Sequence, residues 1–303
     1  MNSKGAQGKI RARVAITSVT ALWGATFTLN KLALVSMPAP TLTLWRFVLA
    51  AAVIGLGWGA KRSFWRGMSR REVALGLLTG ALLFGGYILQ LEGQYYVSPS
   101  VSGFITGLSV VLVPIFLLVY RVSLRPSHVI GAVGAAVGLY LLANPSGKVS
   151  VTGAVLTVVA AAFFGLQIVV VEQWWNGESP FRFVFIQMAW VALFSAIACP
   201  LLGAPFVTAK AQPIAWISVV VDGVGASALA FVTQAWALSK LSSLEIAVIY
   251  SLEPIFAVLV AGLVLGVVMS MLGWLGGIII IGAMSLVALA PPVAGRKSSP
   301  SSD

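Results

Sequence analysis

Long apolar stretches follow one another along almost the whole chain, with short polar segments between them. A helix needs about 20 apolar residues to cross the hydrocarbon core of a bilayer, and each stretch has about that length. We therefore expect an all-α integral membrane protein. Ten membrane-spanning helices are predicted, over residues 14–35, 41–59, 72–92, 98–119, 127–143, 152–172, 182–202, 214–238, 244–265 and 270–289.

The composition agrees with this pattern. Hydrophobic residues make up 59% of the chain and charged residues 9%, and the mean hydropathy is +1.00, whereas soluble domains carry about 25% charged residues. The net charge is +11, but the basic residues are spread over short segments rather than gathered on one domain, which argues against nucleic acid as a partner. Membrane lipid and a small-molecule substrate are the partners that the sequence implies.

Lysine and arginine occupy every second gap between the predicted spans. Because basic residues stay on the cytoplasmic side of a membrane, both chain ends are predicted to be cytoplasmic, with an even number of spans. The segments on that side hold Lys4, Lys9, Arg11, Arg13, Lys61, Arg62, Arg66, Arg70, Arg71, Arg121, Arg125, Arg182, Lys240, Arg296 and Lys297. The opposite loops hold only Lys148 and Lys210, and Lys31 and Arg46 fall inside predicted spans.

Few residues offer catalytic or metal-binding chemistry. Cys199 is the only cysteine and His128 the only histidine, so a metal site of cysteine and histidine ligands cannot be assembled. The chain contains no phosphate-binding GxxxxGK[ST] sequence, so we expect no ATP hydrolysis and no ATPase subunit is implied. We expect neither a cofactor nor enzymatic activity. An ion gradient, the membrane potential or the substrate gradient would then supply the energy for transport.

The two halves of the chain resemble each other weakly but in the same order. An offset of about 140 to 144 residues places Pro114-Ile115-Phe116 on Pro254-Ile255-Phe256, Trp23-Gly24 on Phe164-Gly165, and Gln90 on Gln234. Each half has five predicted spans, an odd number, so the second half would cross the membrane with opposite polarity. Inverted repeats of this kind are typical of alternating-access carriers, whose substrate site lies near the midplane.

The repeat predicts five segments along the chain. They are a cytoplasmic N-terminal segment 1–13, a first five-helix repeat 14–143, a periplasmic linker 144–151, a second, inverted five-helix repeat 152–289, and a polar, proline-rich cytoplasmic tail 290–303 that we expect to be disordered.

Three short motifs resemble those of a known family. They are Trp23-Gly24-Ala25-Thr26-Phe27, Trp45-Arg46-Phe47 and Leu252-Glu253-Pro254-Ile255-Phe256. Together with the repeat they make the chain similar to the EamA branch of the drug/metabolite transporter superfamily. The resemblance implies a ten-helix carrier of the bacterial inner membrane, often an exporter of amino acids or related metabolites, with its substrate cavity between the halves. Gly266-Val267 departs from the Gly-Glu pair common there, so no role of that acidic residue carries over.

Charged residues within predicted spans are the first functional candidates, because such groups are costly in lipid and must face protein or a wet cavity. Glu253 and Asp222 lie near the midplane by their depth in spans nine and eight, and Arg46 and Lys31 would neutralise them or meet a substrate carboxylate. Three roles stay open for the acids: proton coupling, a fixed ion pair with Arg46 or another structural bond, and direct substrate contact.

Prolines at matching positions of spans four and nine indicate kinks. Pro114 and Pro254 each remove a helical hydrogen bond, and both are candidate hinges.

One face of the first span carries polar and aromatic residues. Trp23, Thr26 and Asn30 stand at i, i+3 and i+7, and this face either lines a cavity or packs against Phe163, Phe164 and Gln167 of span six. Tyr250 precedes Glu253 by one turn. The predicted substrate-binding residues are Trp23, Thr26, Asn30, Arg46, Gln167, Tyr250 and Glu253.

The predicted function is secondary transport of small metabolites by alternating access. Amino acids with aromatic or other hydrophobic side chains are the favoured substrates, because aromatic and aliphatic residues with few charges suit amphipathic molecules. A carrier of lipid-like substrates, a flippase or a multidrug exporter stays an alternative. A channel or an intramembrane enzyme is less favoured, since the sequence shows neither a ring of like charges nor a catalytic constellation.

Overall fold

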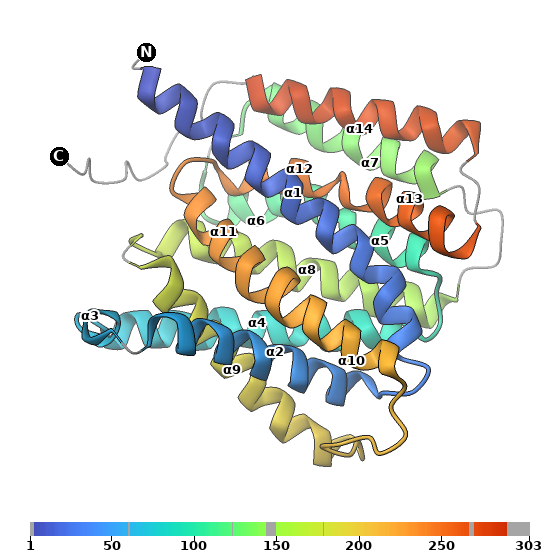
Figure 1. The fold of residues 1–303 in the computed structure, drawn as a ribbon. Helices are drawn as coiled ribbons and strands as arrows, with labels where there is room; N and C mark the ends of the chain where they lie inside the picture. The colour runs from blue at the N-terminus through green and yellow to red at the C-terminus, as the bar shows by residue number, and fades with distance from the viewer. Residues whose placement is uncertain are drawn as a thin grey trace.

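A computed structural model describes residues 3–59, 61–122, 124–143, 150–177, 179–266 and 270–289. Within these ranges the chain forms helices and no strands (Figure 1). The helices are α1 Ser3–Ala33, α2 Ala39–Trp58, α3 Arg62–Trp65, α4 Arg70–Gln94, α5 Pro99–Gly107, α6 Ser109–Val119, α7 Pro126–Ala143, α8 Val151–Trp174, α9 Pro180–Leu201, α10 Pro213–Val220, the π-helix η1 Val221–Leu229, α11 Ala230–Leu238, α12 Ser243–Tyr250, α13 Glu253–Leu265 and α14 Met271–Leu289.

In the described part of the chain, seven helical segments are long and apolar enough to cross a membrane. They are Ala39–Trp58, Arg70–Gln94, Pro99–Val119, Val151–Trp174, Pro180–Leu201, Pro213–Leu238 and Ser243–Val264, and shorter apolar helices cover Pro126–Leu141 and Met271–Val287. Helix α1 contains the first predicted span but is more polar, with several threonines, Asn30 and Lys31. The predicted all-helical membrane architecture is confirmed, and the number of ten spans stays a prediction.

Serine side chains define where many helices begin. Ser69, Ser98, Ser150, Ser179 and Ser242 each accept a hydrogen bond from the backbone N–H three residues further on. A helix leaves its first N–H groups without a partner, and a hydroxyl at this position satisfies one of them. These caps stand beside polar loop residues, so they set the ends of the apolar segments.

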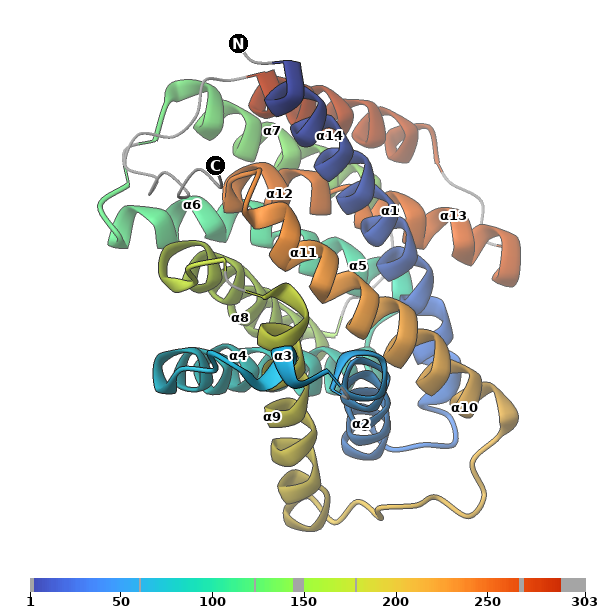
Figure 2. The same cartoon turned by 60° about the vertical axis from the view of Figure 1, so that its left-hand side comes forward.

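Contacts between helices follow a matched pattern in the two halves, α1 to α7 and α8 to α14. Helix α4 packs against α8, and the corresponding segment of the second half, α10 to α11, packs against α1. Helix α6 contacts α8, and α13 contacts α1. Equivalent helices also pair directly, α2 with α9 and α7 with α14, at opposite edges of the molecule (Figures 1 and 2). Equivalent helices of the two halves therefore make equivalent contacts with the other half.

Three membrane-spanning segments are interrupted. The segment predicted over 98–119 divides at Leu108 into α5 and α6, and Pro114 lies inside α6. The segment predicted over 244–265 divides at Ser251 and Leu252. The prediction that Pro254 removes a helical hydrogen bond is wrong, because Pro254 is the second residue of α13, where the backbone N–H has no partner within the helix. In the third segment, η1 replaces α-helical turns between α10 and α11. The interruptions at Leu108, Ser251 and η1 all lie at mid-segment.

Some predicted segments lie outside the described residues. Residues 144–149 of the predicted linker, the predicted tail 290–303 and Val267 belong to this group. At the other end, residues 3–13 of the predicted N-terminal segment continue α1 as helix.

Candidate functional site

A cavity lies between the two halves, lined by side chains from α1, α2, α4, α5, α6, α8, α11, α12 and α13. The cavity and its opening hold about 660 Å³ of space not occupied by protein atoms, and this space includes open solvent at the mouth. The seven residues predicted to bind substrate all line it: Trp23, Thr26, Asn30, Arg46, Gln167, Tyr250 and Glu253. Their contact with a substrate stays a prediction.

Aromatic rings form much of the cavity wall. The ring of Trp23 lies 4.9 Å from that of Tyr250 and 5.5 Å from that of Phe231, between centroids. Tyr87 lies 5.0 Å from Phe164 and 6.4 Å from Phe231. Tilted and edge-to-face pairs such as these are favourable arrangements of aromatic rings. The wall therefore offers flat apolar surfaces to a ligand.

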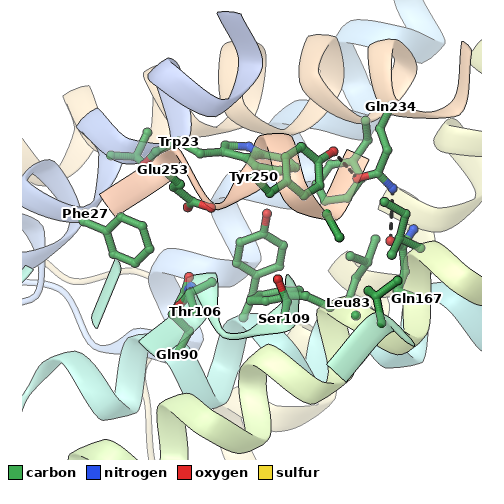
Figure 3. A pocket seen from close by; sticks show the side chains of 18 of the residues that line it. Trp23, Phe27, Leu83, Gln90, Thr106, Ser109, Gln167, Gln234, Tyr250 and Glu253 are labelled. Carbon is green, nitrogen blue, oxygen red and sulfur yellow. Dashed lines mark hydrogen bonds between the residues drawn. The ribbon is translucent and has the colours of Figure 1, made fainter. Parts of the chain in front are cut away.

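The first and third family motifs meet at this wall. A Cβ atom on Gly24 would lie 2.6 Å from the carbonyl oxygen of Glu253 and 2.6 Å from Cβ of Phe256, so only glycine fits there. In the equivalent place of the other half, Gly165 faces Val113 and Phe116. This close approach of α1 to α13 places Trp23 and Glu253 on the same side of the cavity (Figure 3).

Arg46 is held by a group of partners on η1. Its Nη1 lies 3.6 Å from Oδ2 of Asp222, its Nε donates to Oγ of Ser227 at 2.7 Å, and its Nη2 donates to the carbonyl of Ala226 at 3.4 Å. Its guanidinium carbon also lies 4.2 Å from the centroid of the Tyr87 ring. Arg46 and Asp222 expose only 2% and 0% of their side chains, so this ion pair is fully buried.

Asp222 belongs to the π-helix η1 and pairs with Arg46, and it is not among the residues that line the cavity. A π-turn widens the helix and redirects its carbonyl groups, and such turns often occur at functional sites. The carbonyl of Ala226 accepts a hydrogen bond from Nε1 of Trp23 at 2.7 Å as well as the one from Arg46. On the other side of the pair, Oγ of Ser218 lies 2.8 Å from Oδ1 of Asn30 and 3.2 Å from Oδ2 of Asp222.

Glu253 has a different environment. Its side chain lines the cavity with 6% of the residue exposed, and the structure gives its carboxylate no hydrogen bond and no ion pair among the described residues. It begins α13, where the positive end of the helix dipole favours a negative charge. Figure 3 shows the carboxylate directed into the open space opposite Thr106 and Gln90. Glu253 is therefore an acceptor that stays available to a ligand.

A chain of amide and hydroxyl groups lies at another part of the cavity (Figure 3). The hydroxyl of Tyr250 donates to Oε1 of Gln234 at 2.8 Å, and Nε2 of Gln234 donates to Oε1 of Gln167 at 3.0 Å. Apart from this chain, the side-chain amide of Gln90 donates to Oγ1 of Thr106 at 3.0 Å. The sequence prediction did not include Gln90 or Gln234 among the site residues, although their pairing in the internal repeat was the signal that could have found them.

Lys31 lies apart from the acids that it was expected to neutralise. Its Nζ donates to the carbonyl oxygen of Gln94 and, at 3.1 Å, to that of Val97, just beyond the end of α4. A lysine in this place satisfies carbonyl groups that a helix end leaves without partners. Gln187 likewise joins helices rather than lining the cavity, because its amide donates to Oγ1 of Thr79 at 2.8 Å.

A helical membrane protein with a polar and aromatic cavity between two matched halves has the organisation of a membrane transporter. The EamA-like transporter family matches residues 12–144 and again residues 151–289. The chain therefore belongs to the EamA-like transporter family, as the three motifs predicted, and contains two copies of its repeat.

Two further similarities agree with this assignment. An uncharacterized transporter of Archaeoglobus fulgidus is 30% identical over 290 residues, which cover 94% of this chain and 89% of that protein. A crystal structure of a protein with 20% sequence identity superposes with a TM-score of 0.74 over 91% of this chain and 95% of that one. The second similarity shows that the fold is shared.

Proposed function

We propose that this transporter is a secondary carrier that exports amino acids with aromatic or other hydrophobic side chains, and related compounds, by alternating access. The observation that supports the proposal is the combination found in one cavity between the halves: an acceptor without a protein partner, Glu253, beside the aromatic surfaces of Trp23, Tyr250 and Phe231. A free ammonium group and an apolar side chain are the two features of such an amino acid that this combination suits.

Alternating access is supported by the matched contacts of the two halves. Five predicted spans in each half imply an inverted repeat, whose halves exchange conformations to open the cavity to either side. The interruptions at Leu108 and Ser251 are points at which segments four and nine would bend, with Pro114 and Pro254 nearby as the proposed hinges. Charge asymmetry supports cytoplasmic chain ends, and the resemblance to the EamA branch implies the bacterial inner membrane.

Coupling to protons is proposed for Glu253 rather than for Asp222. A carboxyl group that faces the cavity and has no fixed partner can hold a proton when no substrate is bound, and can release it when a cationic group arrives. Asp222 is held against Arg46 and Ser218, so we assign it a structural role.

A multidrug exporter is the second candidate. The aromatic walls and the single available acid would also suit hydrophobic cations, which differ from amino acids in lacking a carboxylate. A lipid-like substrate would need to enter the cavity between helices from the bilayer.

Counterflow in proteoliposomes tests the proposal. Purified protein is reconstituted, the vesicles are loaded with unlabelled phenylalanine or tryptophan, and uptake of the labelled compound is followed with and without a proton gradient. We expect saturable exchange that glycine does not inhibit. Everted membrane vesicles that accumulate the substrate would support export. Failure of all hydrophobic amino acids, with exchange of hydrophobic cations, would replace the proposal by the multidrug alternative.

A further inference from the structure

The cavity of this transporter has one acidic side chain, Glu253, that forms no ion pair among the described residues. Two of its lining residues are ionisable side chains of opposite sign, Arg46 and Glu253, and Asp222 lies directly behind Arg46. Because Arg46 and Asp222 form a buried pair, their charges cancel locally. Glu253 is then the lining residue whose charge, when it is ionised, no protein cation pairs with.

Arg46 is poorly placed to receive a substrate carboxylate. Two of its three nitrogen atoms already donate to Ser227 and to the carbonyl of Ala226, and the third faces Asp222. The ring of Tyr87 covers one face of the guanidinium group. Only two of the five N–H groups of Arg46 donate hydrogen bonds to the protein, but its charge is already paired with Asp222. A carboxylate would therefore compete with Asp222 for this cation and lose its hydration in doing so.

Glu253 is suited to the opposite charge. An ionised carboxylate only accepts hydrogen bonds. The carboxylate oxygen atoms of Glu253 receive no hydrogen bond from the described residues. The neighbouring rings of Trp23 and Tyr250 present electron-rich faces that also favour an organic cation. A buried carboxylate without a partner is unfavourable, so Glu253 holds a proton in the empty cavity, and a bound ammonium group stabilises its ionised form.

We infer that the cavity selects its substrates by charge, so that aromatic monocations bind more tightly than zwitterionic amino acids and aromatic carboxylic acids bind most weakly. The ammonium group binds Glu253, the ring lies against Trp23 and Phe231, and the cavity has no subsite for a carboxylate. This inference rests on the proposed function and specifies which part of an amino acid the protein recognises. Amines formed by removing the carboxylate of aromatic amino acids are the preferred class.

Four compounds with the same indole ring separate charge from shape. Tryptamine is a cation at neutral pH, tryptophan a zwitterion, indole-3-propionate an anion and indole-3-ethanol neutral. Their dissociation constants are measured by calorimetry on the full-length protein in lipid nanodiscs. We expect tryptamine to bind about tenfold to a hundredfold more tightly than indole-3-ethanol, which is the usual value of a hydrogen bond to a charged group, with tryptophan between tryptamine and indole-3-propionate.

Two variants give the controls. Glu253→Gln keeps the shape of the side chain and removes its charge, so tryptamine and indole-3-ethanol should then bind within about threefold of each other, while the binding of indole-3-ethanol shows that the cavity is intact. Glu92→Gln removes an acidic side chain from α4 that does not line the cavity, and the wild-type order should persist.

The possible results distinguish the inference from the proposed function. Binding of indole-3-propionate as tight as that of tryptamine, or an unchanged preference for tryptamine in Glu253→Gln, would overturn the inference while leaving a carrier of aromatic compounds. Absence of binding by all four indoles would overturn the proposed function and this inference with it.

Discussion

Arg46 and Glu253 are the two charged residues that line the cavity, and they differ in the partners that the protein supplies. Arg46 has an acid, a hydroxyl, a carbonyl and an aromatic ring around it, all supplied by the protein. Glu253 is as deeply buried but has no such partner among the described residues. Breaking a buried ion pair leaves its other member buried without a partner, which is costly, whereas a charge that has no partner in the protein can be paired by a ligand. We therefore propose a structural role for the charge of Arg46 and a functional role for that of Glu253.

Removing the cation of the satisfied pair should have the largest effect. Arg46→Met would leave Asp222 charged, buried and unpaired, which costs about 3–5 kcal/mol in comparable cases. We expect a strong fall in the thermal unfolding midpoint in detergent, measured by fluorescence, and a low yield of folded protein.

The matched control is the double variant Arg46→Met with Asp222→Asn. It removes both charges, so it should recover most of the lost stability. A double variant no more stable than the single one would show that Arg46 acts through its packing rather than through its pairing with Asp222.

Removing the unsatisfied charge should affect transport instead of stability. Glu253→Gln should lower counterflow of an aromatic substrate by about tenfold to a hundredfold, because it loses a charged partner worth about 1.5–3 kcal/mol. Its unfolding midpoint should equal or exceed that of the wild type, since a buried charge without a partner has been removed. A loss of stability similar to that of Arg46→Met would mean that Glu253 is held by the protein after all.

The close contact that places Glu253 is the third point to test. Gly24→Ala would bring a methyl group against the backbone of Glu253 and against Phe256, and overpacking of this kind costs about 1–3 kcal/mol. We expect lower stability together with weaker substrate binding, because α1 and α13 would separate. Gly8→Ala, on the same helix with no atom within 4 Å of the new methyl group, is the control and should behave as the wild type.

The amide chain should give the smallest effect. Tyr250→Phe removes the hydrogen bond to Gln234, and hydrogen bonds between membrane helices are worth about 0.6 kcal/mol on average. We expect a change in KM of about threefold in counterflow and little change in stability. Tyr140→Phe, at an exposed position of α7, is the matched control. A large loss of transport in Tyr250→Phe would instead indicate that its hydroxyl contacts the substrate.

The sequence was sufficient to predict the all-helical membrane architecture and the family. Helical spacing placed Trp23, Thr26 and Asn30 on one face, and all three line the cavity. Periodicity succeeds here because it depends only on the regular geometry of a helix. The depth of Asp222 and Glu253 within their predicted spans likewise follows from the sequence alone.

The partners of the charged residues could not be predicted in the same way. Nothing in the sequence indicated the π-helix that contains Asp222, or the break at Leu108, because both depend on how neighbouring helices pack. Lys31 was expected either to neutralise an acid or to meet a substrate carboxylate, yet its Nζ donates to carbonyl groups at and just beyond the end of α4. Depth in the membrane is a local property of the sequence, whereas pairing is a property of the assembled helices.

The most direct measurement of the central claim is heteroexchange in proteoliposomes. Vesicles are loaded with tryptamine, and the uptake of labelled tryptophan is followed for the wild type, Glu253→Gln and Glu92→Gln side by side. If the ammonium group binds Glu253, internal tryptamine will drive tryptophan uptake by the wild type and Glu92→Gln, and this exchange will be lost in Glu253→Gln. Exchange by Glu253→Gln at the wild-type rate would contradict the account.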